Sequence, residues 1–171
     1  MSEPMTGLRM LACDAVLSVA AHGPVCIVLW RGAVTKPTFE VQRAALESVV
    51  KAHDVAALLC IIEAGAKPPD EALRRASVEM VRSHRERLRC VACVFEGVGF
   101  KAASNRAILS GMAMFYEKAP GQQVGVFATV DESAVWLGKH MKLLSPSALP
   151  VDVARMRSWM TAFASESDRA S

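Results

Sequence analysis

Three short apolar segments decide the fold of this chain: VAALLCII (55–62), CVACVF (90–95) and VGVFATV (124–130). Each has the length and the aliphatic, β-branched composition of a buried strand. Each is followed by a polar turn and then by apolar residues at helical spacing. Because two parallel neighbours need a crossover that a helix can supply, this alternation predicts an α/β domain with a largely parallel sheet.

The preceding residues predict an antiparallel strand pair, 15–21 and 25–30, on either side of the turn His22-Gly23-Pro24. Thr38 is a candidate cap for a helix over about 39–53. Further helices are expected over about 70–87, 101–118, 132–141 and 151–167. We therefore expect about five strands in a domain over 15–142, after a leader (1–14) and before a linker and C-terminal amphipathic helix (143–171).

Composition restricts the function classes. At 171 residues the chain fits one domain, and its net charge of +3 is too small to predict nucleic-acid binding. No apolar run approaches the ~20 residues of a membrane span, and the first residues lack a signal-peptide pattern. Five cysteines, an odd number set mostly in apolar strands, favour reduced thiols and hence the cytoplasm.

Three motifs carry a family resemblance: Trp30-Arg31-Gly32 before a helix, the turn Gly97-x-Gly99-Phe100 after a strand, and VFATVDESAVWL (126–137). With these, residues 17–141 resemble the STAS-like superfamily, which includes anti-sigma-factor antagonists and, more distantly in fold, CRAL-TRIO lipid-transfer domains. The resemblance implies a compact mixed sheet and a role in binding or regulation without catalysis.

That resemblance has one departure. Sigma-regulating antagonists carry a phosphorylatable Ser after a central strand, whereas the corresponding loop here, EAGAKPP (63–69), has no hydroxyl group. We expect a non-enzymatic cytoplasmic module that acts through protein–protein contacts, with no phosphoserine switch in that loop. Binding of a small molecule, an anion or a lipid is an alternative, and a lipid carrier would need an apolar cavity.

The best candidate ligand site is an anion site. Gly97 and Gly99 precede a predicted helix that carries Lys101, Ser104 and Arg106 in its first turns. Backbone N–H groups of such a turn can hold an anion. The third glycine of a dinucleotide fingerprint and the Lys-Ser/Thr of a P-loop are missing, and a glycine pair also serves a plain tight turn.

An acidic edge gives the enzyme alternative. Glu63, Glu96 and Asp131 each lie at the carboxyl end of a predicted strand, where open α/β sheets place their ligands. Three carboxylates converging there could hold Mg²⁺ and act on a phosphorylated substrate. The preferred interpretation is that each acid is favoured by the dipole of the helix that follows it.

Cys90 and Cys93 have the spacing of half a zinc or redox site. Residues three apart in a strand point to opposite faces, so we interpret both as structural thiols. His53 and His140 fall near predicted helix C-termini, where they can cap. We therefore assign no metal site, no catalytic residue and no cofactor.

The C-terminal helix carries an apolar stripe that includes Met156, Trp159, Met160 and Phe163. This stripe either packs on its own domain or docks against a partner. Because closed two-fold dimers are the commonest soluble oligomers, the second possibility predicts a homodimer.

Overall fold

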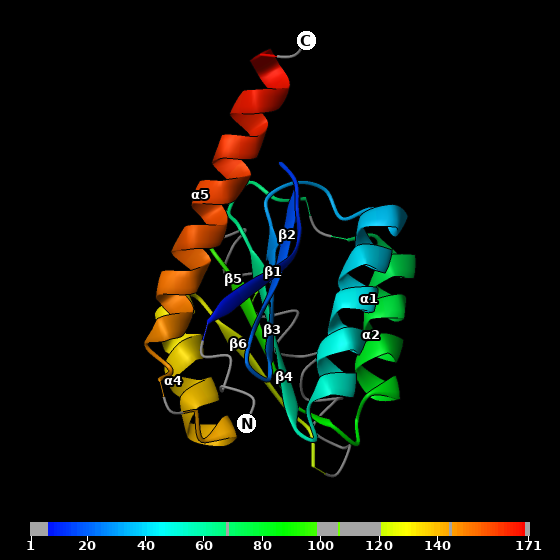
Figure 1. Ribbon diagram of the computed structural model, residues 1–171. Coiled ribbons are helices and arrows are strands. Elements are labelled where there is room, and N and C mark those ends of the chain that lie inside the picture. The colour runs from blue at the N-terminus through cyan, green and yellow to red at the C-terminus, as the bar shows by residue number, and fades with distance from the viewer. Residues whose placement is uncertain (1–6, 68, 99–105, 107–120, 144, 170–171) are drawn as a thin grey trace.

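The computed structural model describes residues 7–67, 69–98, 106, 121–143 and 145–169. Six strands of this part form one sheet in the order β1-β2-β3-β4-β5-β6 (Figure 1). Their bounds are β1 Leu8–Cys13, β2 Leu17–His22, β3 Val25–Trp30, β4 Ala56–Ile62, β5 Leu88–Phe95 and β6 Gln123–Phe127. The spatial order of the strands is therefore their order along the chain.

The sheet is antiparallel from β1 to β3 and parallel from β3 to β6. This confirms the predicted largely parallel α/β sheet and the hairpin at its start. The additional strand, β1, lies within the expected leader (1–14), and the described sheet has six strands where about five were expected. The mixed, partly exposed sequence of β1 gave little strand signal, and pairing with β2 supplies the order.

The described helices lie on both faces of the sheet (Figure 1). Helix α1 (Lys36–Ala52) and helix α2 (Glu71–Ser83) cover one face, and α4 (Val130–Met141) and α5 (Ala148–Arg169) cover the other. Each face has its own apolar cluster, because strands β2 to β5 are buried on both sides.

Helix α1 shows why its sequence folds locally. Thr35 caps it: the Thr35 side chain accepts a hydrogen bond from the Thr38 N–H, and the Thr38 hydroxyl bonds back to the Thr35 backbone. Its inner side, which includes Phe39, Leu46 and Val49, is buried. Trp30 Nε1 donates to Gln42 Oε1 at 3.0 Å. The expected helix is confirmed, with its cap at Thr35 in place of Thr38.

Several predicted boundaries were wrong. Strand β6 ends at Phe127, because Thr129 caps α4 and accepts from the Glu132 N–H at 3.2 Å. Helix α2 ends at Ser83, and α5 already begins at Ala148, inside the expected linker.

The two cysteines of strand β5 point to opposite faces, as predicted. Cys90 belongs to the cluster under α4 and α5, whereas Cys93 packs against the cluster under α1 and α2. Burial raises the pKa of each thiol to about 11, which keeps both protonated and unreactive near neutral pH. Their geometry matches the structural interpretation.

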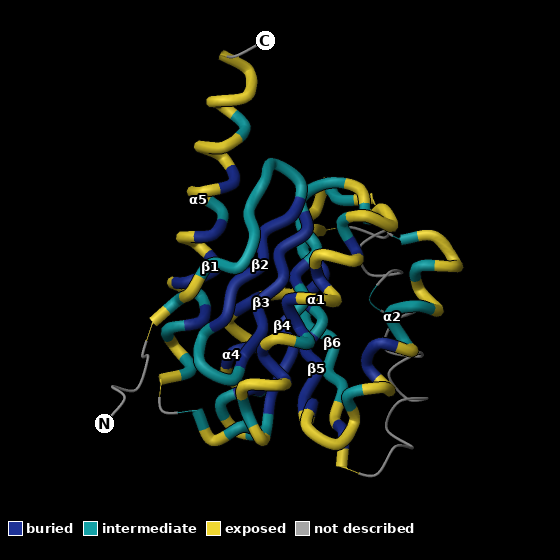
Figure 2. The backbone as a smooth tube through the Cα atoms, turned by 45° about the vertical axis from the view of Figure 1, so that its right-hand side comes forward, coloured by how far each residue is buried: buried dark blue, intermediate teal, exposed yellow. Residues whose placement is uncertain are grey.

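Helix α5 returns across the sheet and extends past its edge (Figures 1 and 2). Near its start the buried Asp152 carboxylate lies 2.6 Å from His22 Nδ1 at the β2–β3 turn. From Thr161 to Arg169 every position except Ala164 is exposed. The first half of α5 is therefore part of the core, and the second half projects into solvent.

Candidate functional site

The parallel strands deliver charged residues to one edge of the sheet. Arg31, Glu63 and Glu96 directly follow β3, β4 and β5. The backbone hydrogen bonds of the sheet continue one residue past the strand ends. The Glu63 N–H donates to the Trp30 carbonyl at 2.9 Å, and the Glu96 N–H donates to the Ile62 carbonyl at 3.0 Å. These backbone bonds position Glu63 and Glu96 at the same edge of the sheet, independently of their side-chain contacts.

Alternating charges connect this edge to α5. Arg31 Nε donates to Glu63 Oε2 at 2.8 Å, and Arg157 Nε donates to Glu63 Oε1 at 3.1 Å. Arg157 Nη2 also donates to Glu96 Oε1. The hydrogen bond to Glu63 raises the pKa of Arg31, so this guanidinium stays charged. We call these four residues the arginine–glutamate ladder.

The ladder changes the interpretation of the three predicted acids. Glu63 and Glu96 are held by arginines of a distant strand end and helix, an arrangement that neither the metal nor the dipole explanation includes. Asp131 lies apart from them in the first turn of α4, as the dipole explanation requires. Within the described residues, no cluster of three His, Cys, Asp or Glu side chains could hold a metal.

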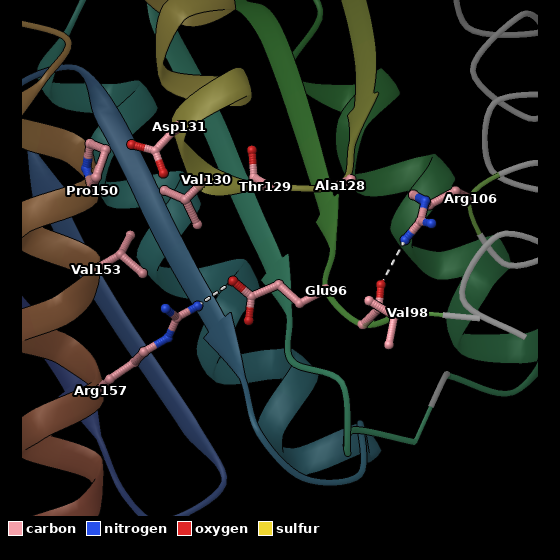
Figure 3. Close-up of a pocket in the computed structure, with 11 residues that line it drawn as sticks. Glu96, Val98, Arg106, Ala128, Thr129, Val130, Asp131, Pro150, Val153 and Arg157 are labelled. Carbon is pink, nitrogen blue, oxygen red and sulfur yellow. Dashed lines mark hydrogen bonds and ion pairs between the residues drawn. The ribbon is translucent and has the colours of Figure 1, made fainter.

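A cleft of about 740 Å³ opens beside the ladder (Figure 3). The end of β5, the start of α4 and one side of α5 form its walls. Its lining residues are Glu96, Gly97, Val98, Arg106, Ala128, Thr129, Val130, Asp131, Pro150, Val153 and Arg157. In Figure 3, Arg157 enters from α5 on one side and Arg106 stands on the other, with Glu96 and Val98 between them.

The lining combines charge with apolar surface. Arg106 Nη1 donates to the Phe95 carbonyl at 3.0 Å and to the Gly97 carbonyl at 3.4 Å. These bonds give the backbone carbonyls at the end of β5 a donor. The apolar members come from all three walls, with Val98 almost fully exposed and Val153 buried. A molecule with one charged group and a short apolar part matches such walls.

The structure places two of the five predicted anion-site residues. Gly97 and Arg106 both line the cleft, and Gly97 has φ 117°, a conformation that other residues rarely adopt. Gly99, Lys101 and Ser104 lie outside the described residues. Gly97 and Arg106 therefore line the same cleft as Glu96.

The predicted C-terminal stripe divides into two pairs. Met156 and Met160 are fully buried against their own sheet, which corrects their assignment to an interface with another chain. Trp159 and Phe163 are 42% and 44% exposed. The burial follows from helix geometry, because 149, 153, 156 and 160 form the side of α5 that faces the strands.

Sequence reasoning missed Arg31 and Arg157 as site residues. Their partners are 32 to 94 positions away along the chain. One signal was present: a lone arginine between Met156 and Met160 interrupts an apolar stripe, and such a charge needs a partner near the edge of the buried face.

None of the described helices is both long and apolar enough to cross a membrane.

No family model matches the sequence, and no curated protein matches it. Among solved structures, the chain is similar to the crystal structure of an uncharacterized protein of the DUF3478 family from Shewanella loihica, described as having a SpoIIAA-like fold. The TM-score is 0.48 at 13% identity, over 80% of this chain and 98% of that chain. The likeness is one of overall fold.

Proposed function

We propose that this protein is a non-catalytic binding module whose cleft beside Glu96 takes up a small molecule with an anionic group and a short apolar part. The observation that carries the proposal is the cleft itself, in which Arg106 and Arg157 stand on opposite sides with Glu96 and Val98 between them. Open α/β sheets place their ligands at this edge, beyond the carboxyl ends of the parallel strands.

The lining balances two arginines with two carboxylates, Glu96 and Asp131, so the support for an anionic head group comes from the start of α4 and from the donors of Arg157. The first turn of α4 opens on the cleft at Thr129 and Val130, and backbone N–H groups of a first helical turn favour an anion. Arg157 donates one hydrogen bond to each of two carboxylates, so an anionic ligand can replace one of these carboxylates as the acceptor. Val98, Val130 and Val153 provide the apolar contact for the rest of the ligand.

The state of the carboxylates supports binding in preference to catalysis. Glu63 accepts from two arginines, and Glu96 accepts from one. A general base or a Mg²⁺ ligand at either position would first have to give up an ion pair, at the cost of leaving a half-buried arginine unpaired. The enzyme alternative therefore requires a rearrangement that simple ligand uptake does not.

A regulatory role through protein contacts is the second candidate, and the exposed Trp159 and Phe163 on α5 favour it. The free cysteines, four of them in strands β3 to β5, agree with the cytoplasm as the compartment. This role and ligand uptake use different surfaces, so one module could combine them.

The test is an NMR titration of the full chain with octanoate, acetate and inorganic phosphate as probes. We expect saturable shifts at the cleft residues with octanoate, and weaker binding of acetate, which lacks the apolar part. Val98→Glu should abolish octanoate binding, because it places a negative charge at the mouth of the cleft. Val135→Glu is the matched control, since Val135 is also well exposed but does not line the cleft.

Equal effects of the two variants would remove the cleft from the explanation. Shifts without saturation, or octanoate shifts confined to α1 and α2 on the far face, would contradict the proposal. Saturable binding of phosphate alone would keep the anion site and reject the apolar part of the ligand.

A further inference from the structure

The exposed side of α5 carries a surface that the cleft does not use, and this surface runs from the docked half of the helix into the projecting half. Arg155, Trp159, Ala162 and Glu166 follow one another at spacings of four, three and four, which places them on one stripe of the helix. All four are exposed, and Phe163 borders the stripe. We call these four residues the α5 stripe. It continues beyond the sheet edge, where α5 stands clear of the rest of the described chain (Figures 1 and 2).

The α5 stripe is complementary to itself when it is reversed. If two copies lie antiparallel, Arg155 of each meets Glu166 of the other, and Trp159 of each meets the small Ala162 of the other. In a parallel pair, arginine would face arginine and glutamate would face glutamate, which costs free energy. Charge and side-chain size therefore select the same orientation.

Arg155 and Glu166 cannot satisfy each other within one chain. Eleven residues of α-helix separate them by about 16 Å along the axis. In the described structure Arg155 makes only a long contact, 3.9 Å to the Asp152 carboxylate, and its side chain is 62% exposed. A partner helix would give it a carboxylate at close range.

We propose that the α5 stripe is the interface of a homodimer, in which two α5 helices pack antiparallel. The two-fold axis crosses the stripe midway between Trp159 and Ala162. The Trp159 side chain of each copy packs over Ala162 of the other, with Phe163 beside it, and two Arg155–Glu166 pairs flank this centre. Because the interface is short, the dimer forms reversibly and weakens as salt is raised.

Sedimentation equilibrium of the full chain tests the orientation. Arg155→Glu and Glu166→Arg should each raise the dissociation constant by about tenfold or more, because each puts like charges opposite one another twice. The double variant should return it to within about threefold of the wild-type value. Since these two positions do not meet within one chain, only an intermolecular pair explains such a rescue.

Trp159→Glu should give a monomer at every concentration. Val41→Glu is its control, because Val41 is 41% exposed on α1, on the opposite face of the sheet. Each variant is checked by thermal unfolding, and Glu166→Arg keeps the test valid if Arg155→Glu disturbs Asp152, since Glu166 is exposed in the projecting segment.

A wild-type monomer at all concentrations would overturn the proposal. A dimer that survives Trp159→Glu, or that the double charge swap fails to rescue, would overturn it as well. Octanoate binding at the cleft is measured separately, so either proposal can fail without the other.

Discussion

Removing Arg157 tests whether the arginine–glutamate ladder stabilises the docking of α5. Arg157→Ala takes one partner from Glu63 and the α5 partner from Glu96, while Glu63 keeps Arg31. The side chains of Arg157 and Glu96 are 35% and 26% exposed. They lie between a surface pair, worth about 0–1 kcal/mol, and a buried pair whose breakage costs about 3–5 kcal/mol. We expect a loss of about 1–2 kcal/mol in the free energy of unfolding.

The assay is urea denaturation in a double-mutant cycle of Arg157→Ala with Glu96→Gln. Most of the loss should be shared between the two positions, which gives a coupling energy of about 1 kcal/mol. Arg75→Ala is the control, because Arg75 pairs with Glu71 on the exposed face of α2 and should change the stability little. A coupling energy below about 0.3 kcal/mol would show that the ladder positions α5 without stabilising it, and would refute this reasoning.

Three further predictions concern the core. Met156→Ala should cost about 2–5 kcal/mol by urea denaturation, because Met156 is fully buried under α5; a loss typical of surface sites would mean that α5 is not docked. Gln42→Ala should cost about 1–3 kcal/mol, since it leaves the buried Trp30 N–H without its acceptor, and a neutral result would place a water there. Burial raises the pKa of Cys26 to about 12 and that of Cys90 to about 11, above the ordinary value of 9.0, so the folded chain holds these protons more tightly than the unfolded chain. The free energy of unfolding should therefore fall between pH 9 and pH 11, by about 1.4 kcal/mol per pH unit for each thiol, and Cys26→Ala should flatten this dependence.

Local patterns predicted most of the fold, because a continuous apolar run such as 55–62 has few environments other than a strand covered on both faces. Strand β1 escaped prediction because its order comes from pairing with β2 and not from its own composition. Val130 illustrates a boundary error of the same origin: it is apolar and β-branched, yet the cap at Thr129 assigns it to a helix.

The candidate site was predictable in its acidic half and at Gly97 and Arg106, but not in the wall that α5 supplies. Glu63 and Glu96 could be placed because a strand end has a known location once the strand order is known. Arg157 belongs to a helix whose position over the sheet depends on the packing of the whole face, and no local pattern encodes that position. The division of the C-terminal stripe into Met156 and Trp159 has the same cause, since only docking decides which side of a helix is covered.

The late position of α5 in the chain has a consequence for biosynthesis. The face of the sheet that includes Ile27, Leu29, Leu59 and Ile61 is covered by residues 130–160, which leave the ribosome after all six strands. Until then the nascent sheet presents one apolar face to solvent, which is the condition that recruits chaperones and promotes aggregation. A premature stop codon before Leu149 would fix the chain in that state, so its product should be cleared by proteolysis while longer products accumulate.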